Sequence, residues 1–300
     1  MINRSGTREG RHSAARGSGW VGALLRGFLG LILGLVLAGC VPEAAPTGAG
    51  AQRDDVHIPP FARWPYQRFS REAAVQIARR EWRAFGSAVV YLNQALPYDA
   101  ERTDGLWQRV GEYWWLGLPM GAPEQGWTGM HDQNGILFPA SEDGNFAWSA
   151  AFIDYVMRMA GAGHRFVYSP IHSDYINAAK EHATGQRPDL VIAAKRPESY
   201  TPQQGDLICM WRGRRPIRYD DLPTDRFPGH CDIVVDIHPG SLDGIGGNVD
   251  NTVAMRHIPV TADGRLAQPD GTVIDPDHPW FVVICVEYDI NGVSVSLAGS

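Results

Sequence analysis

The sequence predicts an α+β fold in which N-terminal helices pack on a mainly antiparallel sheet built from the second half of the chain. Two observations predict it. Apolar residues recur at helical spacing in several segments before Gly185, and beyond Gly185 the apolar period changes to two. Helices that come first and strands that follow favour an α+β order over the regular alternation of a doubly wound fold.

Three segments have the pattern of helices. Ser70 is placed to cap a first helix, whose apolar residues continue to about residue 85. A second helix is expected from near Trp148 to the glycines at 161–163, with Ser149 in or just before its first turn. A third is expected to start with Ser173 as its N-cap.

Strands are expected at 205–210, 230–237 and 280–288, with a shorter candidate at 251–258. In the second of these, alternate side chains point to opposite faces of the sheet. One face is predicted to carry Cys231, Ile233, Val235 and Ile237, and the other His230, Asp232, Val234 and Asp236.

The N-terminus indicates export. Arginines precede an apolar run from Phe28 to Ala38, which is the pattern of a secretory signal peptide. The run Leu37-Ala38-Gly39-Cys40 resembles a bacterial lipobox, in which the cysteine is lipidated and becomes the first residue of the mature protein. We therefore expect a lipoprotein signal peptide at 1–39, a lipidated Cys40 with a flexible tether at 40–60, and a single folded domain at 61–300.

Membrane attachment through the lipid on Cys40 is accordingly the expected partner interaction. The alternatives are an ordinary signal peptide and a lone membrane-spanning helix with an incidental cysteine, but the apolar run is short for a span of about 20 residues. Because Val41 and not an aspartate follows Cys40, resemblance to sorted lipoproteins predicts the outer membrane, facing the periplasm.

Net charge argues against one class of partner, and the cysteine content limits the number of disulfides. The net charge is −6, and removal of residues 1–39 with their five arginines and one glutamate makes it about −10, which disfavours nucleic acid as a partner. Beyond Cys40 the cysteines are Cys209, Cys231 and Cys285. In an oxidising compartment they leave room for one disulfide and one free thiol, and the sequence does not choose the pairing.

Short motifs follow one another in the order typical of papain-like cell-wall hydrolases. A polar loop and an apolar helix flank Ser149, and Gly205-Asp206-Leu207-Ile208, Gly229-His230-Cys231-Asp232 and Ile245-Gly246-Gly247-Asn248 follow. This order resembles the CHAP-type amidase and peptidase domains, which implies a papain-like fold and a hydrolytic site. The sequence departs from that pattern at the nucleophile, because Ser149 stands where those enzymes carry cysteine.

A closer resemblance is to the DUF2272 family of bacterial domains of unknown function. It rests on three segments: Trp148-Ser149-Ala150-Ala151-Phe152-Ile153, His172-Ser173-Asp174-Tyr175-Ile176 and Ile245-Gly246-Gly247-Asn248-Val249. Membership implies a fold and leaves the mechanism open.

The motifs assign candidate roles. Ser149 at a helix N-terminus is the candidate nucleophile, His230 the base, and Asn248 the residue that orients the imidazole, with Asp232 as the rival orienting residue. The structural alternatives are a helix cap for Ser149, a hydrogen-bonded strand histidine for His230 and a turn-forming role for Asn248. His172 and the aromatic residues Trp127 and Trp148 are candidate substrate-binding residues.

These residues support three hypotheses. The first is a lipid-anchored hydrolase of peptidoglycan amide or peptide bonds. The second is a non-catalytic module that binds envelope glycans or peptides, and the third is a structural lipoprotein. We find no motif for a cofactor or a metal ion, and expect neither.

Overall fold

The structure is a computed structural model that describes residues 68–90, 100–266, 270, 272, 275 and 277–289. The predicted signal peptide, Cys40 and the predicted tether lie outside these residues, so lipidation stays a prediction. Among the described residues, no helix is both long and apolar enough to cross a membrane.

The described chain contains helices in its first half and strands mainly in its second, as predicted. The α-helices are α1 (Arg71–Ala84), α2 (Leu106–Gly117), α3 (Ser149–Met159) and α4 (His172–Ala183). The strands are β1 (Ala88–Val90), β2 (Ile192–Lys195), β3 (Leu207–Trp211), β4 (Gly229–His238), β5 (Ser241–Val249), β6 (Thr252–Pro259) and β7 (Trp280–Val286).

All of these strands join one sheet, in the order β1-β6-β5-β4-β3-β7-β2. The β1–β6 pair is parallel, and every other pair is antiparallel. The mainly antiparallel sheet and the α+β class are therefore confirmed.

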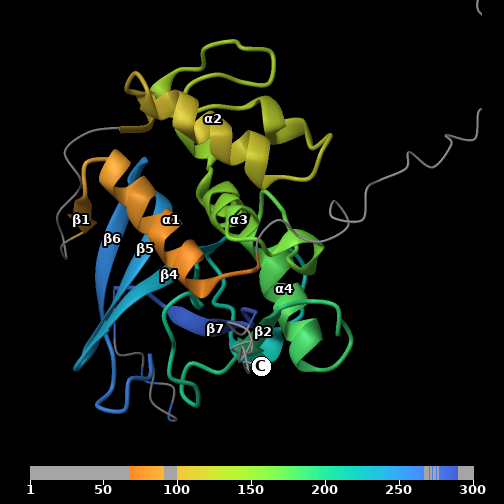
Figure 1. Ribbon diagram of the computed structural model, residues 1–300, viewed down its shortest axis with the longest axis vertical. Helices are drawn as coiled ribbons and strands as arrows, with labels where there is room; N and C mark the ends of the chain where they lie inside the picture. The colour runs from red at the N-terminus through yellow and green to blue at the C-terminus, as the bar shows by residue number, and fades with distance from the viewer. Residues whose placement is uncertain are drawn as a thin grey trace, which may run out of the picture. The chain divides into compact units, whose positions relative to one another are not determined.

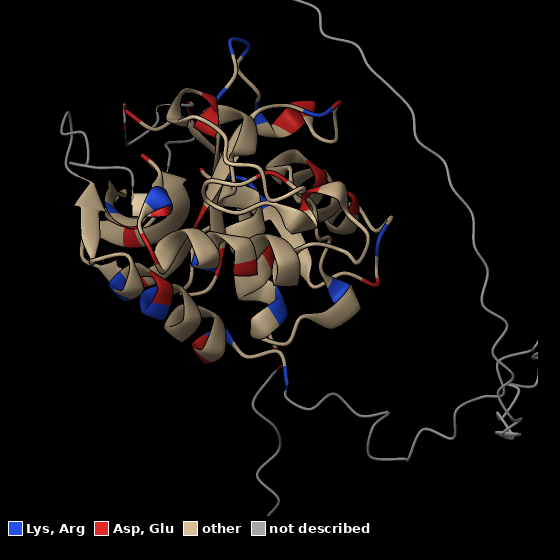
Figure 2. Ribbon diagram, turned by 90° about the horizontal axis from the view of Figure 1, so that it is seen from above, with Lys and Arg blue, Asp and Glu red and all other residues tan. Residues whose placement is uncertain are grey.

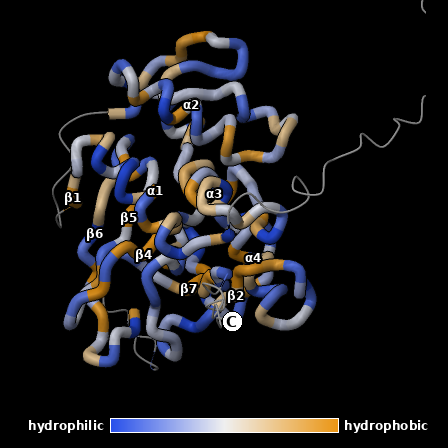
Figure 3. The backbone as a smooth tube through the Cα atoms, in the orientation of Figure 1, coloured by the Kyte–Doolittle hydropathy of each residue, from blue (hydrophilic) through white to orange (hydrophobic). Residues whose placement is uncertain are grey.

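Helices α1, α3 and α4 cover one face of the sheet, and α2 packs on α3 (Figure 1). The alternation of β3 separates two apolar clusters: Leu207 and Cys209 point into the main core beneath the helices, while Ile208 and Met210 belong to a second cluster on the opposite face. Most of α3 is buried, and hydrophobic residues dominate its trace in Figure 3. This central helix carries the candidate nucleophile at its start.

Helix α1 is capped as predicted and is joined to α2 by a buried carboxylate. Ser70 Oγ accepts a hydrogen bond from the Ala73 amide at 3.2 Å. Glu81 is fully buried and bonds Arg109 at 2.6 Å and the Tyr113 hydroxyl at 2.7 Å. Burial alone would raise the pKa of Glu81, but these hydrogen bonds and the Arg109 charge outweigh it and lower the pKa.

Helix α4 begins two residues earlier than predicted, so the expected Ser173 cap is wrong. Ile171 occupies the cap position and His172 is the first helical residue. Ser173 lies inside the first turn, where its hydroxyl is buried without a hydrogen-bond partner. The shift places His172 at the helix terminus.

The predicted alternation of β4 holds only through its first half. The β4–β5 register shifts between Val234 and Asp236, which marks a β-bulge that interrupts the alternation. Cys231, Ile233 and Val235 lie in the main core as predicted, but Ile237 is 43% exposed. The expectation that Ile237 shares their face is therefore wrong.

Cys209 and Cys231 form a disulfide between the neighbouring strands β3 and β4, where they are register partners. Cys285 on β7 is a free cysteine of intermediate burial. The structure thus chooses one of the pairings that the sequence left open.

Candidate functional site

The first residues of α3 and α4 are hydrogen-bonded to each other. Ser149 opens α3 directly after Trp148, and His172 opens α4. Ser149 Oγ lies 2.6 Å from His172 Nε2. Both side chains are buried, with 6% and 4% of their surfaces exposed. The hydroxyl therefore has an imidazole partner in a position with little competing water.

The second ring nitrogen of His172 is held by Tyr175, one helical turn further along α4. His172 Nδ1 and the Tyr175 hydroxyl form a short hydrogen bond. Burial raises the pKa of Tyr175 well above its usual value, so the phenol stays protonated. In the tautomer whose Nε2 accepts the Ser149 proton, Nδ1–H donates to the Tyr175 oxygen. Tyr175 thus fixes the orientation of the ring, and its hydroxyl can accept the Nδ1 proton in the tautomer that base catalysis by Nε2 requires.

A second imidazole stands beside the first. The rings of His172 and His230 have centroids 5.4 Å apart. His230 Nε2 lies 2.9 Å from Asp232 Oδ1, and Arg256 Nη1 lies 2.6 Å from Asp232 Oδ2. Asp232, predicted as the rival orienting residue, is therefore the carboxylate partner of His230.

Charges around His230 fix its protonation. Burial would raise the pKa of Asp232, but the Arg256 charge and the His230 hydrogen bond outweigh it and lower the pKa well below its usual value. Burial and then the Arg212 charge lower the pKa of His230 to about 4. A neutral His230 donates its Nε2 proton to the carboxylate and leaves a lone pair on Nδ1, and Nδ1 is buried without a protein partner.

The structure does not pair Ser149 with His230 as the sequence analysis expected. The alternation of β4 explains the difference: Cys231 and Ile233 point into the core beneath α3, so His230 and Asp232 start from the other face of the strand. The side chain beside Ser149 is instead that of His172, the first residue of α4. A catalytic role for His230 stays a prediction, but the hydrogen-bond partner of Ser149 is His172 and not His230.

The glycines of β5 make room for this arrangement. A β-carbon on Gly246 would lie 2.1 Å from Asp232 Oδ1 and 2.7 Å from His230 Nε2. A β-carbon on Gly247 would lie 2.4 Å from Phe152 of α3. The Gly-Gly pair therefore allows β5 to approach the His230 pair on one face and α3 on the other.

Asn248 and Trp148, also predicted as site residues, are part of the sheet and of the core. Asn248 lies within β5, where its φ of 53° coincides with the shift in β5–β6 register between Gly246 and Val249, while Asp232 takes the position beside His230. Trp148 is fully buried, bonds Glu101 through its indole nitrogen and packs on Tyr113. The prediction that Trp148 binds substrate is therefore wrong, because its ring belongs to the core.

Trp127 is partly exposed and stays a candidate for binding substrate. Its indole nitrogen donates to Gln133 Oε1 at 2.8 Å, and its ring contacts Trp114 and Phe146 edge-on. These contacts hold the ring in place with part of its surface accessible.

A cationic loop adjoins the two imidazoles. This segment, residues 212–228, is called the arginine loop because it contains Arg212, Arg214, Arg215, Arg218 and Arg226. The Arg212 charge contributes to the lowered pKa of both His172 and His230, so the loop begins beside the site. Elsewhere acidic and basic positions are interspersed (Figure 2).

Two cavities lie outside the Ser149–His172 pair. One of about 690 Å³ is lined by the arginine loop, including Arg214, Arg215 and Phe227. Another of about 570 Å³ lies between α1 and the Val235 region of the sheet. Within the described residues, a His/Asp group with the spacing of metal ligands lies at the far end of β4 from His230.

Sequence reasoning missed His172 as the partner of Ser149, along with Tyr175 and Arg256. The available signal was the spacing of His172 and Tyr175, since residues three apart on a helix lie on the same side. Nothing in the sequence connected Arg256 of β6 with Asp232 of β4, because strand order decides that contact.

Comparison with known proteins places these residues in one family segment. Residues 101–286 match the family described as "Uncharacterized protein conserved in bacteria (DUF2272)". The chain belongs to this family. The predicted membership is confirmed, and the segment includes the Ser149–His172 pair and the His230–Asp232–Arg256 cluster. No curated protein matches the chain, and no solved structure does.

Proposed function

We propose that this chain is a lipid-anchored protein of the bacterial cell envelope whose papain-like domain hydrolyses amide or peptide bonds of peptidoglycan, with Ser149 as the nucleophile. The observation that carries the proposal is the 2.6 Å hydrogen bond from Ser149 Oγ to His172 Nε2 at the start of a buried helix. A serine hydroxyl is a weak nucleophile and needs an adjacent base, and this contact supplies one.

The reaction follows from this contact. Ser149 Oγ attacks the substrate carbonyl carbon as His172 Nε2 accepts the hydroxyl proton. Negative charge then develops on the carbonyl oxygen. Unpaired N–H groups and the positive dipole end in the first turn of α3 favour that charge. The protonated His172 returns its proton to the leaving nitrogen, and water then releases the acyl group from Ser149 by the same route.

Tyr175 and His230 support the two ends of the site. Tyr175 orients the His172 base. In the sequence-based prediction the base was His230 and the orienting residue was Asn248. His230 is fixed through Nε2 by Asp232, and its ring packs beside that of His172. His230 is thus assigned a supporting role beside the base and not the first proton transfer.

The substrate class rests on location and charge. The lipobox at Cys40 predicts a protein on the envelope, where peptidoglycan is the abundant amide-bonded polymer. Its peptides carry free carboxylates, and the arginine loop beside the imidazoles offers guanidinium groups that bind carboxylates in a bidentate manner. The helix packed across antiparallel strands supports the papain-like assignment.

A second candidate, a non-catalytic module that binds envelope peptides, is favoured by a different observation. Burial lowers the pKa of His172 well below its usual value, with further lowering from His230 and Arg212. A base with a low pKa gains less from accepting a proton. Under this alternative the arginine loop holds a ligand and the serine hydroxyl only packs against His172.

Turnover of defined peptidoglycan fragments, followed by mass spectrometry, tests the proposal. Ser149→Ala and His172→Ala should each reduce turnover by at least about 10³-fold, and the double variant should lose little more, because members of one catalytic unit fail together. Ser199→Ala, at an exposed serine, is the matched control and should retain wild-type activity. Wild-type turnover in Ser149→Ala would reject the nucleophile.

His230→Ala decides which imidazole is the base. With His172 as base, His230→Ala should retain measurably more activity than His172→Ala. The opposite ranking would return the base role to His230. Tight fragment binding by the wild type without turnover, together with amidase activity in Ser149→Cys, would favour the binding module.

A further inference from the structure

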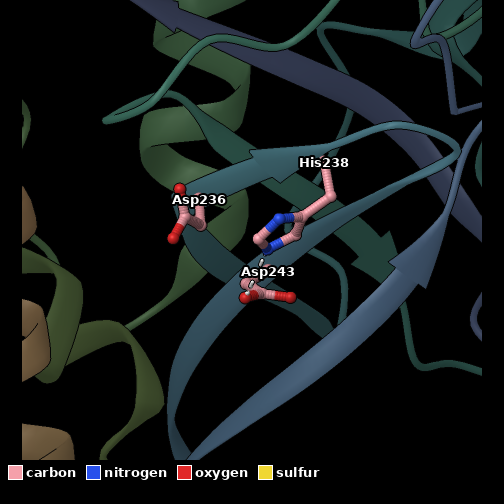
Figure 4. Close-up of side chains that lie close together, drawn as sticks. All are labelled: Asp236, His238 and Asp243. Carbon is pink, nitrogen blue, oxygen red and sulfur yellow. Dashed lines mark hydrogen bonds and ion pairs between the residues drawn. The ribbon is translucent and has the colours of Figure 1, made fainter.

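A group of metal-type ligands lies at the β4–β5 hairpin, away from the Ser149 site. Ligand atoms of Asp236, His238 and Asp243 all lie within 4.8 Å of one another. Figure 4 shows the His238 imidazole directed at the Asp243 carboxylate, with Asp236 beside them. His238 Nε2 lies 3.1 Å from Asp243 Oδ2.

Strand register places these groups in a row across the sheet. Asp236 of β4 is the register partner of Asp243 of β5, and Asp243 is the partner of His257 of β6. His238 follows Asp236 by two residues and so shares its face. The bulge after Val234 is what turns Asp236 onto the face of Asp243, and bulges commonly re-aim side chains at functional positions.

The row brings two carboxylates together, and their partners are one arginine and two histidines. Two carboxylates stand directly opposite each other, and like charges in that position destabilise a sheet. Arg79 of α1 pairs with Asp236 at 3.0 Å and offsets one of them. Asp243 is only 7% exposed, and no arginine or lysine pairs with it among the described residues; its partners are His238 and His257.

We propose that Asp236, His238 and Asp243 form a binding site for a divalent transition-metal ion of the Zn²⁺ class. One imidazole and two carboxylates on neighbouring strands are a donor set that suits Zn²⁺ and disfavours Ca²⁺ and Mg²⁺, which prefer oxygen ligands alone. Water completes the coordination at the exposed side. The ion neutralises the facing carboxylates and ties β4 to β5.

His257 supports this site without being one of the three grouped ligands. Its Nδ1 lies 2.7 Å from Asp243 Oδ1, on the oxygen opposite the one that faces His238. A carboxylate held in this way presents its second oxygen in a fixed direction, as hydrogen-bonded metal ligands generally do. Loss of the His257 side chain should weaken Zn²⁺ binding by about 10- to 100-fold.

Titration calorimetry with ZnCl₂ on the purified full-length protein, prepared without a polyhistidine tag, tests the proposal. We expect one Zn²⁺ per chain, with binding lost in Asp243→Asn and in His238→Gln, weakened in His257→Gln, and no comparable binding of MgCl₂. The control is His278→Gln. His278 forms a similar pair with Asp275 at 2.7 Å, but within the described part of the chain no third ligand joins them.

The alternative is that these residues only hydrogen-bond one another. Absence of Zn²⁺ binding to the wild type would overturn the site. Unchanged binding in both His238→Gln and Asp243→Asn would also overturn it and would assign the binding to other ligands such as Cys285. Circular dichroism shows whether each variant is folded. Should Asp243→Asn fail to fold, Asp236→Asn at the half-exposed position removes another ligand of the same site and should likewise abolish Zn²⁺ binding.

Discussion

Replacing Gly246 by alanine would test whether the glycine of β5 is required by the buried His230 pair. The φ of Gly246 is outside the left-handed region, so the added methyl acts through space and not through backbone strain. It would lie 2.1 Å from Asp232 Oδ1, and β-carbon contacts essentially never fall below 3.0 Å. Asp232 or β5 must therefore move by about 0.9 Å in a region of close packing.

The expected cost has two parts. Overpacking a core typically costs about 1–3 kcal/mol. Displacing Asp232 also weakens its buried pair with Arg256, and breaking such a pair outright costs about 3–5 kcal/mol. We expect Gly246→Ala to lower the free energy of unfolding by about 3 kcal/mol, which corresponds to a fall in Tm of roughly 6–12 °C for a domain of this size.

Urea and thermal denaturation followed by circular dichroism measure the effect. Gly144→Ala is the matched control, because no atom lies within 4 Å of its added methyl and its backbone is not left-handed. It should change stability by less than about 0.5 kcal/mol. A Gly246→Ala protein as stable as Gly144→Ala would refute the close approach of β5 to Asp232.

Three further predictions concern pH, redox state and export. His230 has a folded pKa of about 4 and His172 a folded pKa well below its usual value, so both bind protons more readily when unfolded. The stability that the two neutral histidines contribute is present above about pH 6.5 and is lost as pH falls toward 4, at up to about 1.4 kcal/mol per pH unit for each histidine. In urea denaturation, His230→Gln should make the free energy of unfolding depend less on pH. A wild-type free energy of unfolding that does not change with pH would contradict this prediction. Reduction of the Cys209–Cys231 bridge, which joins residues 22 apart, should cost about 3 kcal/mol, and equal denaturation midpoints with and without reductant would argue against the bridge. Cys40→Ala should abolish incorporation of labelled fatty acid and leave precursor or soluble protein, whereas an unlabelled wild type would show that Cys40 is not an anchor.

Elements with strong local signals were predictable from the sequence. Helix α1 has a side-chain cap at Ser70, and α3 has a nearly continuous apolar surface, so both were identified close to their observed bounds. Strand β5 was missed because its glycines have low strand propensity, and they occur there for tertiary reasons, to admit Asp232 and Phe152.

The candidate site was only partly predictable. The place of Ser149, the proposed nucleophile, at the start of a helix followed from the sequence. Its partner depends on how α4 packs beside α3, and that packing produces no recognisable residue spacing in the sequence. The same limit applies to Asp236, His238 and Asp243, which come together through strand register and a bulge and match no metal-binding motif.

The buried carboxylate of Glu81 ties helix α1 to the segment by which the family is recognised. That segment starts at residue 101, so it contains Arg109 and Tyr113 but not the acid that both of them bind. A fragment trimmed to the segment would bury a phenol without its acceptor and leave Arg109 without this partner. Relatives should therefore gain or lose the acid and the arginine together, and an upstream helix should accompany the family segment wherever that arginine is kept.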